Sequence, residues 1–199
     1  MITRQFALAA SALVWLQACG NVYAGDKDFT PRIYIEINEA PRAVFPGATR
    51  FERKDVVVTK EMSQNIRARV GQAKPTIWET SYITFIAKKD TAVIGYAIIC
   101  EEIGKHYPMT FIVGVTPAGQ IEDVAILAYR EPYGGEVRYK GFLRQFQKKS
   151  LKNPIMPYKD IVNVTGATLS VRALTRGVRK ALAAVQTIYL DETAKAGGK

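Results

Sequence analysis

Length, composition and charge limit what this chain can be. It has 199 residues, of which 48% are hydrophobic and 10% aromatic, which is enough to bury one ordinary core. The formal net charge of +10 favours anionic partners, such as nucleic acid, membrane lipid or acidic proteins. With one histidine and two cysteines, zinc or haem ligation and a Ser-His-Asp triad are poorly supported.

Residues 1–24 are predicted to be a secretory signal peptide. Arg4 supplies a short positive region, and the apolar run at residues 6–16 is too short to span a bilayer comfortably. The Val-Tyr-Ala sequence ending at Ala24 favours ordinary cleavage there. The alternative is a lipoprotein whose Cys19 becomes a membrane-anchored N-terminus, although Gln17 is unusual in such a signal. Export to the periplasm or another extracytoplasmic site argues against nucleic acid as a partner.

The middle of the chain predicts two helices and then a run of strands. One helix is expected to open at Asn38-Glu-Ala-Pro41 and to end at Pro46-Gly47, and a second to run from a Thr59 cap to Gly71. Segments rich in Ile, Val, Tyr and Phe predict four strands, at residues 77–87, 93–101, 110–115 and 121–129. Short turn-like separators make neighbouring strands antiparallel. We therefore expect an α+β fold, an antiparallel sheet packed by helices, as one domain over residues 25–193 with a polar tail at 194–199.

A glycine-containing loop follows the last predicted strand. The sequence Arg130-Glu-Pro-Tyr-Gly-Gly-Glu-Val137 leads into a helix expected to place Tyr139, Phe142, Leu143 and Phe146 on one face. Turn chemistry alone favours a glycine turn before a core-facing helix. A basic run is predicted to be a solvated helix face, with a docking surface for an acidic redox partner or anionic lipid as the alternative: Lys140, Arg144, Lys148, Lys149 and Lys152.

The next stretch, Asp160–Ser170, is predicted to contain a strand-to-helix turn at residues 165–168. Ile161, Val162 and Val164 indicate a short buried strand, and apolar spacing from Val171 to Tyr189 indicates a long amphipathic helix. A hydroxyl of Thr165 or Thr168 can cap the helix, and Gly166 permits a tight bend. Such a helix start attracts anions. Three arginines on one side of the helix add positive charge: Arg172, Arg176 and Arg179.

The segment Thr165-Gly-Ala-Thr-Leu-Ser170 resembles the flavinylation motif of the FMN-binding domain family. That family includes the C subunit of the sodium-pumping NADH:quinone reductase, the G subunit of the Rnf complex and the periplasmic domain of nitrous-oxide reductase regulators. The resemblance extends over about residues 38–190 and includes the Phe-Pro-Gly segment at 45–47, the strand series and the glycine loop. In the family, the last Thr of the motif carries FMN through a phosphoester, which implies covalent FMN on Thr168. Many members have an Asp where this chain has Val162.

The resemblance also implies the composition of the flavin site. The implied cofactor-binding residues are Thr165, Gly166, Ala167, Thr168, Leu169 and Ser170 of the motif, with Glu131, Gly134 and Gly135 beside the flavin ring. No metal ligand or catalytic residue is expected.

The resemblance further implies FMN as the cofactor, an FAD:protein FMN transferase that installs it, and redox protein partners. The expected function is that of an exported electron carrier rather than an enzyme. Two alternatives remain open: a non-redox sensory or interaction module of the same fold, and a flavin-dependent reductase acting on a small substrate.

Overall fold

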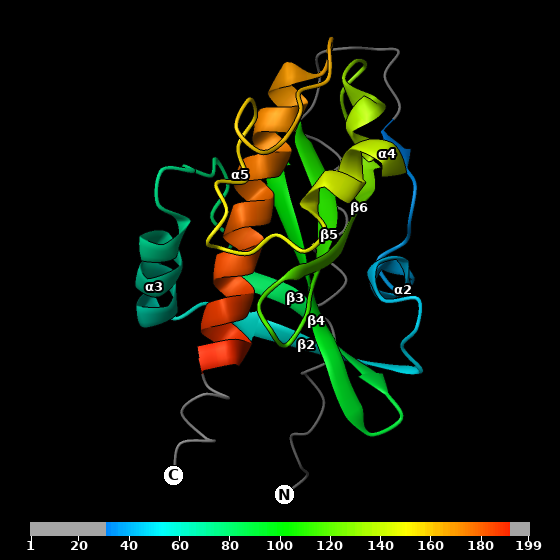
Figure 1. Cartoon of the computed structure of the whole chain (residues 1–199), viewed down its shortest axis with the longest axis vertical. Coiled ribbons are helices and arrows are strands. Elements are labelled where there is room, and N and C mark those ends of the chain that lie inside the picture. The colour runs from blue at the N-terminus through cyan, green and yellow to red at the C-terminus, as the bar shows by residue number, and fades with distance from the viewer. Residues whose placement is uncertain (1–30, 192–199) are drawn as a thin grey trace, which may run out of the picture. The chain divides into compact units, whose positions relative to one another are not determined.

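A six-stranded antiparallel sheet forms the framework of the described part of the chain, which is residues 31–191 of a computed structural model (Figure 1). Its order is β1-β6-β5-β4-β3-β2, and every neighbouring pair is antiparallel. The strands are β1 (Arg32–Ile33), β2 (Arg50–Val57), β3 (Ser81–Lys89), β4 (Ala92–Ile103), β5 (Pro108–Val115) and β6 (Ile121–Tyr129). The expected α+β class with an antiparallel sheet is confirmed.

Helices cover both faces of this sheet. The elements are α2 (Ala40–Val44), α3 (Lys60–Val70), the 3₁₀ turns η1 (Gly135–Arg138) and η2 (Arg144–Phe146), α4 (Lys140–Leu143) and α5 (Thr168–Val185), which continues into the π-helical η3 (Gln186–Leu190). The long α5 lies against the sheet with α3 beside it, and α2 lies on the opposite side (Figure 1). Within residues 31–191, no helix is both long and apolar enough to cross a bilayer.

Side-chain alternation along the strands divides the interior into two cores. On β4, Ile98 and Cys100 belong to the larger core under α5, whereas Ala97 and Ile99 belong to the smaller one under α2. Because both faces of the central strands are covered, these strands are apolar on both sides. This explains why β4 and β5 are almost continuously hydrophobic in sequence.

Two helix predictions are confirmed in detail. Thr59 caps α3, since its Oγ1 accepts the backbone N–H of Met62 at 3.2 Å, and α3 ends at Gly71 with φ +65°. The early helix exists as the five-residue α2 and ends before Pro46. Local capping and proline signals act within a few residues, which is why they can be read directly from the sequence.

Other expectations are wrong. The strand predicted at residues 161–164 does not form, and only an isolated bridge joins Ile161 to Pro157. Val162 is 73% exposed instead of buried. The helix expected after the glycine loop breaks into η1, α4 and η2, which bury Phe142 and Phe146 but leave Tyr139 outside.

Two strands were absent from the prediction. In β2, charged and apolar residues alternate only weakly, and most side chains are exposed, as is usual in an edge strand. β1 contributes only two residues to the other edge. The expected signal peptide with Cys19 and the expected tail at 194–199 lie outside the described residues, and the domain limits at 25 and 193 stay predictions.

Gly177 sets how closely α5 approaches the sheet. A Cβ built at this position would collide with the Phe111 ring on β5 and lie 2.7 Å from Cγ of Glu102 on β4. Both neighbours are buried, so neither can move away freely.

We therefore expect Gly177→Ala to lower the free energy of unfolding by about 1–3 kcal/mol, because overpacking outweighs the helix propensity that alanine adds. The matched control is Gly141→Ala in α4, where a Cβ meets nothing within 4 Å. This control should leave stability unchanged or raise it by up to ~1 kcal/mol. Urea denaturation measures both, and equal effects would contradict the role given to Gly177.

Candidate functional site

The two predicted functional stretches meet at the start of α5. Gly134 of the loop after β6 has φ +87°, and a Cβ there would lie 2.6 Å from Ser170 Oγ and 2.8 Å from Tyr129 Oη. Only glycine fits this position, on both conformational and steric grounds. The glycine loop therefore packs directly against the first turn of the helix that carries the motif.

Tyr129 joins these two stretches by hydrogen bonds. Its hydroxyl donates to the carbonyl oxygen of Tyr133 at 2.7 Å and lies 2.7 Å from Ser170 Oγ. Because the phenol has one proton, the Ser170 hydroxyl is the donor in the second bond. Burial raises the pKa of Tyr129 to about 12, so the phenol stays neutral and keeps this arrangement at ordinary pH.

Thr168 is the first residue of α5, and its side chain is partly exposed. The preceding Thr165-Gly166 turn is exposed, with Gly166 at φ +83°, as the predicted tight bend requires. The predicted capping is wrong, because the N-cap is Ala167 and no side chain caps α5. The first N–H groups of an 18-residue helix are thus without a side-chain acceptor, and they present positive charge toward the turn.

Asn163 contacts the Thr168 hydroxyl. The sequence analysis did not predict this contact. Its Nδ2 donates to Thr168 Oγ1 and to Tyr158 Oη, each at 2.9 Å. Its Oδ1 is buried and has no hydrogen-bond partner. Turning the amide over would let Oδ1 accept both hydroxyl protons instead. An asparagine in a turn-rich stretch carries no signal that separates this contact from an ordinary turn role.

Glu131 is buried and anchors a neighbouring loop. Its Oε1 accepts the backbone N–H groups of Lys105, of His106 at 2.7 Å and of Tyr107 at 3.1 Å. This carboxylate therefore closes the turn between β4 and β5. Glu131 also lines a hollow of about 150 Å³ together with Gly134, Gly135 and four tyrosines: Tyr34, Tyr129, Tyr133 and Tyr139.

A second hollow, of about 340 Å³, is lined by residues 72–74, by residues 155–158 and by the first half of α5. Met156, Tyr158 and Arg172 are among its lining residues. Apolar side chains around Thr168 are unusually exposed for their size: Tyr133 at 83%, Tyr158 at 71%, Val162 at 73% and Leu169 at 45%. Such a group of exposed apolar side chains favours a flat apolar ligand or a protein partner.

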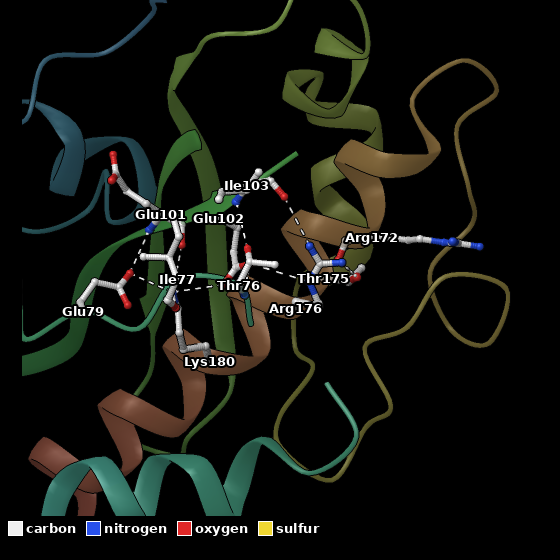
Figure 2. Close-up of polar contacts among 10 residues, drawn as sticks. All are labelled: Thr76, Ile77, Glu79, Glu101, Glu102, Ile103, Arg172, Thr175, Arg176 and Lys180. Atoms are coloured by element: carbon white, nitrogen blue, oxygen red, sulfur yellow. Dashed lines mark hydrogen bonds and ion pairs between the residues drawn. The ribbon is translucent and has the colours of Figure 1, made fainter. Parts of the chain in front are cut away.

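The three arginines predicted to add charge to the helix have different environments. Arg179 donates to the carbonyl oxygens of Val70, Leu151 and Asn153. Arg176 lies 3.7 Å from Glu102 Oε2. Arg172 is exposed, makes no ion pair within residues 31–191, and points away from the buried groups (Figure 2). It is therefore the arginine of the three that can supply charge to a ligand near Thr168.

A buried ion cluster fixes α5 on the sheet further along the helix (Figure 2). Lys180 is fully buried, and its Nζ donates to Ile77 O and Glu101 O, both at 2.9 Å, and to Glu79 Oε1 at 2.8 Å. It also lies 3.3 Å from Glu102 Oε1. The other Glu102 oxygen accepts from the Thr76 hydroxyl at 2.7 Å and backbone N–H at 3.0 Å.

The charge on Lys180 depends on these acidic neighbours. Burial by itself lowers the pKa of Lys180, but the surrounding acidic groups, Cys100, Glu79 and Glu102, outweigh it and raise that pKa above its ordinary value. The stabilising contribution of a lysine with a raised pKa is fully present below its unfolded pKa, near 10.4, and is lost as pH rises through the folded value. The cluster is therefore intact at neutral pH.

We expect Lys180→Met to lower the free energy of unfolding by about 3–5 kcal/mol at pH 7, because the partly buried Glu79 loses its cation and the buried Glu102 keeps only Arg176, at 3.7 Å. This loss of stability should become smaller as pH rises above about 10.4 through the raised pKa of Lys180, since the wild-type cluster then loses its cation as well. Urea denaturation at pH 7 and at about pH 11 measures it, with the exposed Lys152→Met as the control. A deficit that does not change with pH would mean that lost packing, rather than stranded charge, causes it.

Comparison with known proteins identifies this region as a recognised domain. The family model described as "FMN-binding domain" matches residues 104–183, which contain both the glycine loop and the Thr165–Ser170 motif. The match agrees with the arrangement found here, in which those two stretches are in contact.

Two curated relatives are similar to this chain. The G subunit of the proton-translocating ferredoxin:NAD(+) oxidoreductase complex of Clostridium ljungdahlii is 29% identical over 110 residues, which cover 52% of this chain and 60% of that protein. The G subunit of the Na(+)-translocating ferredoxin:NAD(+) oxidoreductase complex of Acetobacterium woodii is 25% identical over 194 residues, which cover 92% of this chain and 89% of that protein. The chain thus spans about three-fifths of the first relative and most of the second.

Proposed function

We propose that this chain is an FMN-containing electron-transfer protein that carries its FMN as a phosphoester on Thr168. The match of residues 104–183 to the FMN-binding domain model and the similarity to G subunits of ferredoxin:NAD(+) oxidoreductase complexes support this proposal. The observation that carries this proposal is the position of the Thr168 hydroxyl. It lies in the first turn of an uncapped helix, is partly exposed, and is held by Asn163. A phosphate on this oxygen would meet the free N–H groups of α5.

The residues present fit such a group. Asn163 Nδ2 is a hydrogen-bond donor 2.9 Å from Thr168 Oγ1, and the exposed Thr165-Gly166 turn leaves the phosphate end open to solvent. Gly134 lets the glycine loop pack closely against the turn that carries Thr168. The helix dipole stabilises an anion at an exposed site by only ~0.3–1 kcal/mol, which is too little to retain a cofactor against dilution. Covalent attachment therefore has a physical purpose in a protein outside the cytoplasm.

The attachment step needs a second protein, an FAD:protein FMN transferase. A bond forms between Thr168 Oγ1 and the FMN phosphorus, the pyrophosphate bond of FAD breaks, and AMP leaves with its phosphate. The hydroxyl proton is released. Asn163 orients the hydroxyl, and the exposed Thr165-Gly166 turn gives a transferase access to it.

Once bound, the flavin supplies one- and two-electron redox chemistry, and the protein supplies orientation and field. We propose that the motif residues Thr165, Gly166, Ala167, Leu169 and Ser170 surround the phosphate end. Glu131, Gly134 and Gly135 would lie beside the ring, where adjacent glycines allow backbone to approach a flat face. Arg172 would add positive charge near the phosphate. In this proposal none of these side chains performs a bond-breaking step, which suits an electron carrier.

The proposed partners are redox proteins of a membrane complex. The relatives are named as G subunits of ferredoxin:NAD(+) oxidoreductase complexes. We propose that this chain likewise exchanges electrons with protein subunits of such a complex from an extracytoplasmic position. Its signal peptide would bring it there, with cleavage after Ala24 or lipidation at Cys19.

We expect Thr168→Val, produced together with the transferase, to be folded and colourless and to lack the mass of one FMN. Thr165→Val should stay flavinylated and change stability by less than about 0.5 kcal/mol, because Thr165 is exposed and caps nothing. Mass spectrometry of the tryptic peptide ending at Arg172 tests both variants. Covalent flavin remaining on Thr168→Val would overturn the attachment site.

A second variant tests whether the flavin ring lies beside the glycine loop. A Cβ on Gly135 meets only the Tyr129 ring, at 3.7 Å, so Gly135→Val should fold. We expect it to shift the flavin absorbance spectrum or reduction potential while attachment at Thr168 survives. Gly141→Val, in a position where a Cβ meets nothing, is the control. An unchanged spectrum and potential in Gly135→Val would mean that this loop is only a turn.

A further inference from the structure

A groove of about 510 Å³ lies between β6 and the two helices α2 and α4. Residues 123–126 of β6, Ile35, and Ala43 of α2 line it, and α4 with its flanking turns contributes the wall that contains Arg138, Lys140 and Arg144. Tyr34 and Arg138 line both this groove and the 150 Å³ hollow beside the glycine loop. A molecule in the groove would therefore lie next to the proposed flavin site.

The wall of the groove is basic. Arg138, Lys140 and Arg144 line it with exposed side chains, and none of the three forms an ion pair with a carboxylate within residues 31–191. Arg138 is held in place, since its guanidinium lies 5.0 Å from the ring centre of Tyr34 and 4.7 Å from that of Tyr139. Asp123 is the acidic residue in the lining. Three basic residues and one acidic residue therefore line the groove.

The floor of the groove is an open sheet edge. β1 pairs with β6 only at Ala128 and Tyr129, and the chain after β1 adds two bonds to Leu127 O. At the other end, Ile121 exchanges backbone bonds with residues 148–149. Between these points, residues 123–126 have no neighbouring strand on their outer side in the described part of the chain. This gap of four residues is about 13 Å long.

The Asp123 side chain occupies part of this edge. Its Oδ1 accepts the backbone N–H of Val124 at 2.9 Å, so a carboxylate stands where a neighbouring strand would place a carbonyl oxygen. An incoming strand could replace it, because both supply an oxygen acceptor to the same N–H group.

We propose that this groove binds an extended acidic segment of a partner protein, which adds a short strand to β6 and places its carboxylates against Arg138, Lys140 and Arg144. Strand addition gives affinity through main-chain hydrogen bonds, and the basic wall selects acidic side chains. An anionic membrane would meet the three basic residues without using the concave sheet edge. That the partner is a redox protein rests on the proposed function, whereas peptide binding itself does not.

The probe is a fluorescent eight-residue peptide of alternating Glu and Val, measured by fluorescence anisotropy with the full mature chain. We expect saturable binding that weakens by about tenfold or more in Lys140→Glu/Arg144→Glu. The matched control is Lys89→Glu/Lys152→Glu, which makes the same change in net charge at two exposed lysines outside the groove. It should weaken binding by less than about twofold at 0.15 M salt, where distant charges are screened.

Two further measurements test the sheet edge. A peptide with N-methyl groups on alternate amides should lose binding, since it cannot pair along one side. Ala43→Trp, an exposed position that lines the groove, should also weaken binding because the larger side chain fills the groove. Undiminished binding of the methylated peptide, or equal losses in both charge-reversed pairs, would overturn the proposal.

Three outcomes separate this proposal from a membrane-facing surface and from the proposed function. Binding to phosphatidylglycerol vesicles that is lost in Lys140→Glu/Arg144→Glu, with no peptide binding, would overturn it in favour of a membrane-facing surface. Peptide binding that persists in the colourless Thr168→Val variant supports the groove independently of the flavin. If the wild-type chain carried no FMN yet bound the peptide, the proposed function would fail and the groove would stand.

Discussion

The buried contact between Lys180 and its carboxylate partners is the constraint on which the rest of the structure depends. It joins α5 to β4 and to the segment before β3 through Glu79 and Glu102, groups whose burial would be costly without a cation. Gly177, one turn earlier, lets α5 lie directly on the Phe111 ring. A helix held by both close packing and buried charge has little freedom to slide or rotate.

The position of α5 in turn defines the candidate flavin site. The first turn of this helix carries Thr168 and Ser170, and Ser170 bonds to Tyr129 at the end of β6. The loop that follows β6 then folds back so that Gly134 lies against the same turn. A shift of the helix would separate the proposed attachment oxygen from the glycine loop, so in the proposed site the distant ion cluster would also hold the cofactor geometry.

The groove beside β6 extends this arrangement toward a partner. An electron carrier needs its cofactor close to the surface where partners dock, because it must exchange electrons without releasing the cofactor. Tyr34 and Arg138 are shared by the groove and the glycine-loop hollow, so a docked segment and a bound flavin would be neighbours. The net charge of +10 indicates only a general preference for anions, whereas the fold gathers three of the cations on one wall of one groove.

The sequence by itself determined the features that depend on neighbouring residues or on regular burial: the α+β class, the four central strands, the Thr59 cap, and the bend at Gly166. These follow from hydrogen bonds a few residues apart and from periodic apolar positions, both visible in one stretch of chain. Only the tertiary structure decided that β2 is a strand, since its polar edge resembles a loop until β3 pairs with it. It also decided that Lys180 is a buried anchor rather than a solvated charge, that Glu131 closes a turn, and that Asn163 holds Thr168. Each of these roles is created by a partner that folding brings close, and no local pattern records which partner that will be.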